Sequence, residues 1–163
     1  MALGDNTLAA ARGASARGRQ PYMVQTIVDL ATALSDKGSA LAAGDVIPVI
    51  AVPKGTMILN AGIEVDTVTS GGVTTFDLGT GVDADCFVDG MDGSDSTAAG
   101  TIAQNAAAFQ PLVAVAADNI DLKLVTQSGT ALTTGKLRIY ALLMDINDTG
   151  IGVADIADRD YLA

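Results

Sequence analysis

The chain has 163 residues, 49% of them hydrophobic and only 4% aromatic, and its formal net charge is −10. A chain of this length is expected to form one domain around one core, and it lacks the run of ~20 apolar residues that would cross a bilayer, so no membrane partner is expected. It contains no histidine and a single cysteine, which excludes the usual base for a nucleophilic serine or cysteine and the usual zinc ligands.

The charge is divided unevenly along the chain. Residues 1–20 carry Arg12, Arg17 and Arg19 against Asp5, a net of +2, whereas residues 21–163 carry six basic and 18 acidic residues, a net of −12. An acidic body repels phosphate, so nucleic acid is not expected as a partner. The first twenty residues have no continuous apolar stretch typical of a secretion signal, which favours synthesis in the cytoplasm.

The N-terminal sequence MALGDNTLAAARGASARGRQP predicts a flexible arm over residues 1–21, because it shows no strand alternation. The run YMVQTIVDLATAL, from residue 22, is rich in β-branched residues and predicts a first strand. Two prolines inside VIPVIAVPKG, Pro48 and Pro53, restrict that run to an edge strand or an extended link.

Alternating residues then predict further strands. Ile63 and Val65 share one face, and Glu64 and Asp66 the other, before a Gly-Gly pair that predicts a hairpin turn into VTTFDLGTG. Three more runs follow, PLVAVAAD, NIDLKLVTQSG and GKLRIYALLMDI, and the end of the third, ALLMDI, loses the alternation and predicts a segment buried on both sides.

These short runs predict an all-β fold, an antiparallel β-sandwich of the jelly-roll kind, over residues 22–146. The stretch STAAGTIAQNAAAFQ is compatible with either a short helix or a long loop. Residues 147–163 have no strand pattern and predict a second extended arm.

The segment FDLGTGVDADCFVDG, from Phe76, allows three interpretations. A phosphate loop is excluded because its glycines are followed by carboxylates and not by Lys-Ser/Thr. A calcium loop is disfavoured because the spacing of the aspartates does not match the known pattern, so turns built by Asp and Gly are the preferred interpretation. Cys86 and Phe87 are expected to plug this loop against the core, and no cofactor or metal is expected.

The residues PKGTMILNAGIEVDTVTSGGVTTFDLGTGVDADCFVDGMD, from residue 53, and TTGKLRIYALLMDI, from residue 133, carry a resemblance. Their order resembles the capsid decoration, or cement, proteins that many tailed bacteriophages encode beside the major capsid protein. The resemblance implies a jelly-roll-like sandwich without an active site, assembled as a homotrimer on the exterior of the virion capsid and bound to the major capsid protein. Terminal arms interlock some trimers of this kind.

The resemblance and the two arms together predict the contact residues, which are Arg12, Arg17, Arg19, Tyr22, Tyr161 and Leu162. The chief alternative is a trimeric receptor-binding or fibre module of a virion, which exposed aromatic residues in a groove would favour. A hydrolase built on carboxylates would need two acids about 5 to 9 Å apart in a cleft. No enzyme activity is expected.

Overall fold

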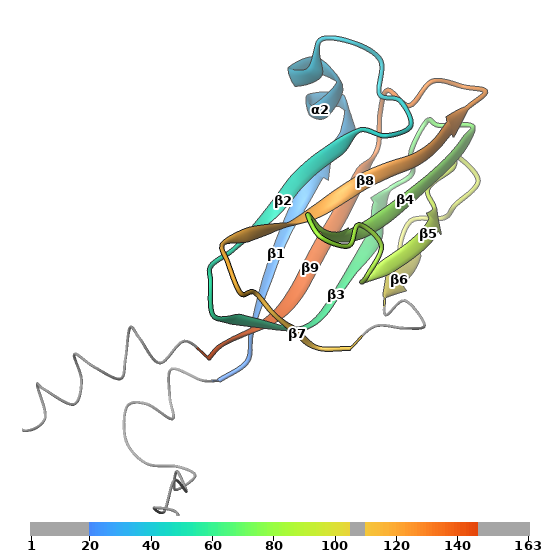
Figure 1. Cartoon of the computed structure of the whole chain (residues 1–163). Helices are drawn as coiled ribbons and strands as arrows, with labels where there is room; N and C mark the ends of the chain where they lie inside the picture. Colours follow the sequence, from blue (N-terminus) through green and yellow to red (C-terminus); the bar gives the residue numbers. More distant parts are fainter. Residues whose placement is uncertain (1–19, 105–109, 147–163) are drawn as a thin grey trace, which may run out of the picture.

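A computed structural model describes residues 20–104 and 110–146 of the chain. Two antiparallel sheets pack face to face (Figure 1), which confirms the all-β sandwich. The first, which we call the β1 sheet, has the order β1 (Tyr22–Asp29), β9 (Lys136–Asp145), β3 (Thr56–Thr67), β6 (Ile102–Gln104), with β7 (Leu112–Val113) also on β3. The second, the β2 sheet, has the order β2 (Val46–Val52), β8 (Asp118–Ser128), β4 (Val73–Thr80), β5 (Val88–Asp92).

The chain passes repeatedly from one sheet to the other, and its first and last strands are neighbours. This order is compatible with a jelly roll, which stays a prediction. The expected hairpin between β3 and β4 is wrong, because the two strands belong to different sheets. The segment that joins them bonds instead to the connection between β8 and β9: Ser70 N donates to Thr134 O at 3.1 Å, and Gly72 N donates to Thr130 O at 3.0 Å.

The first predicted strand is correct only in its first half. After β1 the chain turns into a helix, α2 (Leu30–Lys37), at one end of the sandwich (Figure 1). The side chain of Asp29 accepts a hydrogen bond from Ala31 N at 3.0 Å and caps the helix. Gly38 ends it with φ +70°, a left-handed conformation that a residue with a Cβ adopts at a cost. Asp29 was the signal for a helix start within a run that otherwise resembles a strand.

The prolines in and after β2 have the effect that the sequence predicts: Pro48 lies in β2, and Pro53 directly follows its last residue. β2 is an edge strand of its sheet, where a residue without an N–H leaves no partner unsatisfied. Its pairing with β8 shifts register between Pro48 and Ile50.

The core lies between the two sheets and is built from aliphatic side chains with Phe76 and Phe87. The predicted alternation is confirmed, since the inward side chains of β8 and β9 are buried: Ile120, Leu122, Leu124, Leu137, Ile139 and Ala141. Fully burying one such Leu or Ile side chain contributes roughly 1.5–3 kcal/mol. In the described part of the chain, no helix is long and apolar enough to span a bilayer.

Candidate interaction surface

The structure places one of the six predicted contact residues. Tyr22 begins β1, is 43% exposed and lies opposite Leu143 near the end of β9. The other five, Arg12, Arg17, Arg19, Tyr161 and Leu162, lie outside the described residues. Because Tyr22 pairs with Leu143, β1 begins beside the place where β9 ends, at the end of the sandwich opposite α2 (Figure 1).

The outer face of the β1 sheet is apolar at this end. Residues that oppose each other in register point to the same side of a sheet. Met23 opposes Leu142, and Met57 opposes both Met144 and Val113. Met23 is 66% exposed and Val113 is 39% exposed. We call these five residues the apolar face.

The next row along the sheet is polar but uncharged. The Tyr140 hydroxyl donates to Gln104 Oε1 at 2.7 Å, so the tyrosine ring reaches from β9 across β3 to β6. A Cβ at Gly62, which lies between them, would collide with the Tyr140 side chain and approach Ala103 O to 2.9 Å. The glycine therefore allows the ring to lie flat over the sheet. Burial, with a smaller contribution from the Glu64 charge, raises the pKa of Tyr140.

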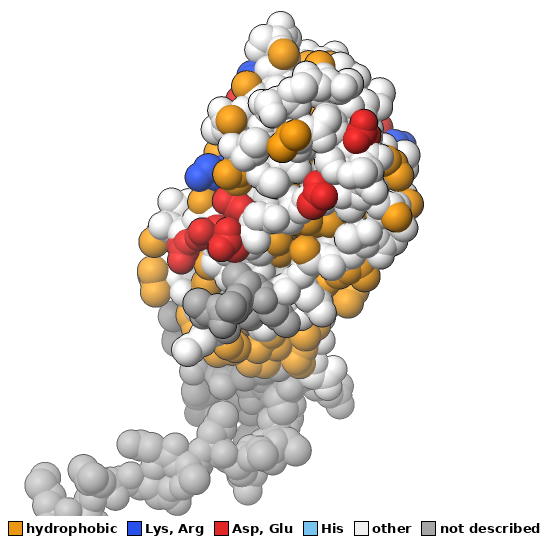
Figure 2. All heavy atoms as spheres, turned by 90° about the vertical axis from the view of Figure 1, so that its right-hand side faces the viewer, with side chains coloured by type: hydrophobic (Ala, Val, Ile, Leu, Met, Phe, Trp, Pro, Cys, Tyr) orange, Lys and Arg blue, Asp and Glu red, His pale blue; other side chains and the backbone are white. Residues whose placement is uncertain are grey.

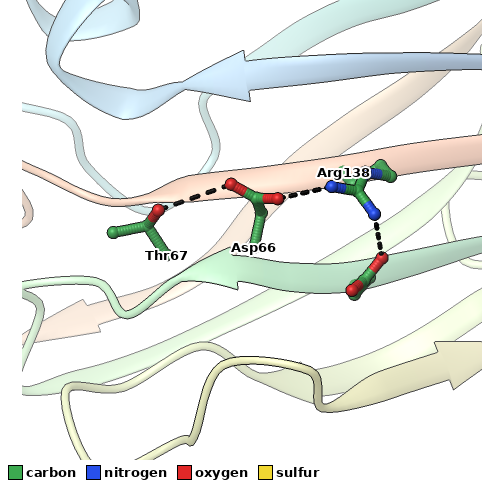
Figure 3. Close-up of polar contacts among 4 residues, drawn as sticks. Asp66, Thr67 and Arg138 are labelled. Atoms are coloured by element: carbon green, nitrogen blue, oxygen red, sulfur yellow. Dashed lines mark hydrogen bonds and ion pairs between the residues drawn. The ribbon is translucent and has the colours of Figure 1, made fainter.

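Further toward α2 the outer face of the β1 sheet carries paired charges. Arg138 on β9 donates to Glu64 Oε2 at 2.9 Å and to Asp66 Oδ1, both on β3 (Figure 3). Lys136 Nζ lies 3.5 Å from Asp29 Oδ2. Each basic side chain of this face thus has an acidic partner, and the whole face carries two positive and three negative charges.

The outer face of the β2 sheet has a different character. Asp77 and Asp121 point outward from β4 and β8, and the loop that contains Asp83 and Asp85 folds over Gly79. Together with Asp89 of β5 we call these five carboxylates the acidic face. Lys123 opposes Asp77 in register and is the basic residue among them.

Three carboxylates of the acidic face, Asp77, Asp83 and Asp121, have raised pKa values. Burial raises the pKa of Asp77, with the charges of Asp85 and Asp89 adding to it, although Gly90 N donates to Asp77 Oδ1 at 2.8 Å. Burial also raises the pKa of Asp121, and the nearby Asp118 charge adds to the effect. A hydrogen bond with Asp85 raises the pKa of Asp83. Within residues 20–104 and 110–146 no three acidic or cysteine side chains are grouped so that they could hold a metal ion.

A cavity of about 350 Å³ is lined by the last residue of β2, by β7 and by the segment that leads from β7 to β8. In Figure 1, β7 lies at the end of the sandwich opposite α2. The lining of the cavity is mainly apolar and includes Val52, Ile58 and Cys86. Two further lining residues, Val82 and Val115, are 94% and 82% exposed. Figure 2 shows one side of the molecule, on which hydrophobic side chains gather mainly over the lower half of the described part.

Just after the segment from Phe76, Asp92 forms a turn of the expected kind: its Oδ1 accepts a hydrogen bond from Ser94 N at 2.9 Å, which is the local bond of an Asx turn. Phe87 is fully buried, as expected for a plug, whereas Cys86 is half-buried. Burial raises the pKa of the Cys86 thiol to about 11, so this thiol is protonated at neutral pH and is a poor nucleophile.

Sequence reasoning missed the apolar face. The run ALLMDI predicts burial on both sides, but Leu142 and Met144 are only half-buried and point outward. Alternation continues through the run, with Leu143 in the core. The signal was an apolar residue at each outward position of β9 beyond Tyr140, and a run of this kind marks either a covered sheet or an exposed contact surface.

No protein-family model matches the chain, and no curated protein matches it. Solved structures do share its fold. A chain of the cyanophage Pam1 capsid asymmetric unit superposes with a TM-score of 0.63 at 15% identity, covering 88% of this chain and 96% of that one.

Two further similar chains come from phage capsids. A chain of the capsid of Ralstonia phage GP4 gives a TM-score of 0.56 at 16% identity, covering 77% of this chain and 84% of that one. A chain of the acidic stable capsid of Helicobacter pylori bacteriophage KHP30 gives 0.51 at 12% identity, covering 76% and 86%. The chain described here thus has the fold of chains found in three phage capsids.

Proposed function

We propose that this chain is a structural protein of a phage virion: a homotrimeric cement, or decoration, protein that binds the outside of the major capsid lattice and stabilises the head. The observation that carries the proposal is the likeness to the cyanophage Pam1 capsid chain, which extends over 96% of that chain. A likeness over nearly the whole length means that the two chains correspond as whole domains and do not merely share a common motif.

The proposal includes no catalysis. The chain has no histidine, and its one thiol, at Cys86, has a pKa of about 11, so the usual nucleophile and general-base pairs are absent from it. The three capsid chains that share its fold agree with a structural role.

The surface of the sandwich suits attachment through many weak contacts. The described residues carry five basic and 14 acidic side chains, a net of −9, which keeps a protein displayed at high density soluble. A trimer makes three attachments at once, so contacts that are individually weak add up to firm retention. The predicted arms, residues 1–21 and 147–163, would add contacts beyond the sandwich, and this role for them is part of the proposal.

The proposal is tested by adding the purified protein to phage heads that lack it. Heads are prepared from the phage that encodes this chain, with its gene deleted, and are mixed with increasing amounts of protein before sedimentation. We expect saturable co-sedimentation with heads and a higher temperature of head disruption. If the protein stays in the supernatant while the heads sediment, or if it binds only to tails or to host cells, the result contradicts a cement function and favours the fibre alternative.

A further inference from the structure

We infer that the apolar face is where copies of this chain contact one another, with the outer face of the β1 sheet directed toward the symmetry axis of the trimer. This inference rests on the proposed homotrimer and adds to it the surface through which the copies meet.

The distribution of charge favours this surface for contact between copies. Two copies of a body with a net charge of −9 repel each other unless they meet where charge is absent or already neutralised. Three successive rows on the outer face of the β1 sheet contain no charged residue: Met144, Met57 and Val113; Met23, Leu142 and Asn60; Gln25, Tyr140, Gly62 and Gln104. Beyond these rows Arg138 and Lys136 are already paired with carboxylates of the same face.

The opposite surface is unsuited to contact with a second copy. Three exposed carboxylates, Asp83, Asp85 and Asp89, lie there beside the buried Asp77 and the half-buried Asp121, with one basic residue, Lys123. Bringing two acidic faces together would place like charges in a region of reduced solvent, and the cost of such a contact is several kcal/mol. A second copy of this chain is therefore expected to avoid the acidic face and to bind at the apolar face.

The shape and chemistry of the apolar face also fit a packed contact. Tyr140 lies flat across Gly62, so no aromatic ring projects from the sheet. Three of the five residues of the apolar face are methionines, Met23, Met57 and Met144, whose flexible side chains adapt to an opposing surface. Given the usual strand and residue spacings, four strands and five rows of the sheet span on the order of 500 Å². That area is smaller than the roughly 800 Å² per partner of a standard interface, so the contact is weak for one pair and gains from closure into a ring of three.

The test is cysteine cross-linking, for which the chain offers a matched control. Met23→Cys places a thiol on the apolar face, and Val46→Cys places one on the outer side of the β2 sheet at similar exposure, 66% and 51% for the native side chains. The native Cys86, half-buried and with a pKa of about 11, contributes little background. We expect oxidation to link copies through residue 23 at least tenfold faster than through residue 46. Any pattern in which residue 23 does not link faster overturns the inference.

A second variant separates contact between copies from contact with the capsid. Met23→Asp adds a charge to the apolar face at an exposed position, so the sandwich should still fold, as circular dichroism would verify, and sedimentation velocity should show monomers; Val46→Asp should leave the oligomer intact. If Met23→Asp stays oligomeric but no longer binds heads, the face contacts the capsid protein and the inference is wrong while the cement function stands. If the unaltered protein is monomeric at the concentration that saturates heads, the homotrimer of the proposed function fails together with the inference.

Discussion

At the scale of single residues, Asp121 and Asn60 are the two described residues that have a buried side-chain oxygen without a hydrogen-bond partner, and Asp121 is the ionisable one. It lies on β8 between Pro48 of β2 and Gly79 of β4. Its Oδ1 is buried and has no hydrogen-bond partner within the described part of the chain. Burial and the charge of Asp118 raise its pKa, which means that the folded state disfavours ionisation of this carboxyl more than the unfolded state does.

We expect Asp121→Asn to increase the free energy of unfolding at pH 7 by on the order of 0.5–1 kcal/mol, since solvent screens a partly exposed group. Because the pKa of the Asp121 carboxyl is higher in the folded state, the folded state loses stability relative to the unfolded state as the pH rises and the carboxyl ionises. Below the pKa of the unfolded state both states are protonated, so this loss of stability disappears. The gain should therefore vanish near pH 3. Urea unfolding at both pH values measures it, with the exposed Asp95→Asn as control for the same change in net charge. An equal gain at both pH values would show that burial of the charge is not the cause.

At the scale of elements, β3 depends on a close approach to its neighbours. Gly62 of β3 leaves room for Tyr140 of β9 to reach Gln104 of β6. We expect Gly62→Ala to lower the free energy of unfolding by about 1–3 kcal/mol, because the added methyl group meets both the tyrosine side chain and the carbonyl of Ala103.

Two further variants identify the cause of that loss. Tyr140→Phe removes only the hydroxyl bond to Gln104 and should cost about 1 kcal/mol. Combining Gly62→Ala with Tyr140→Ala removes the collision with the ring, so the double variant should lose less stability than the two single variants together. Strictly additive losses, measured by urea unfolding, would mean that Gly62 does not act through Tyr140.

The elements also show what the sequence can and cannot predict. Strands with regular alternation, such as β8 and β9, follow directly from the inward spacing of Ile120, Leu122 and Leu124, because a core between two sheets requires a period of two. The partners of strands do not follow, since Gly71 and Gly72 are as suitable for a crossing between sheets as for a hairpin. α2 was not predicted because its cap, Asp29, is itself the last of the eight residues of β1, so no break separates the strand from the helix.

The candidate surface was predictable only in part. Tyr22 was expected at a contact because it adjoins the N-terminal arm; it is exposed at the start of β1 but is not part of the apolar face, and its role in a contact stays a prediction. The apolar face was not expected, because sequence alone does not distinguish an outward apolar residue covered by the same chain from one available to another chain. The assignment needed the register, which places Met23, Met57 and Met144 on the outer face of one sheet.

At the scale of the whole molecule, the two ends of the sandwich chain lie close together. β1 begins at Tyr22 and β9 ends at Asp145, next to each other in one sheet. Residues 1–20 carry a net charge of +2, whereas the sandwich that follows them carries a net charge of −9. Opposite charges attract, so we expect the N-terminal segment to be drawn toward the acidic surface of its own sandwich or of a neighbouring one.

We expect deletion of residues 1–20 to leave the thermal unfolding of the sandwich unchanged and to weaken retention on heads by on the order of tenfold or more, because in the proposed trimer the loss of one attachment per copy removes three attachments at once. A full-length variant with Arg12, Arg17 and Arg19 changed to Gln separates charge from length. If charge is the cause, this variant should match the deletion at low salt and the difference from the unaltered protein should shrink at high salt. Retention of the truncated protein at the unaltered level would refute a role for the segment.

The central claim is that this chain is a component of the capsid surface, and an electron cryomicroscopy reconstruction of the intact phage head tests it most directly. The account predicts density for the two-sheet sandwich on the outside of the shell, in groups of three around the three-fold and quasi-three-fold axes, with the acidic face away from the axis. A head whose outer surface carries no such density, or a sandwich located only in the tail, would contradict it.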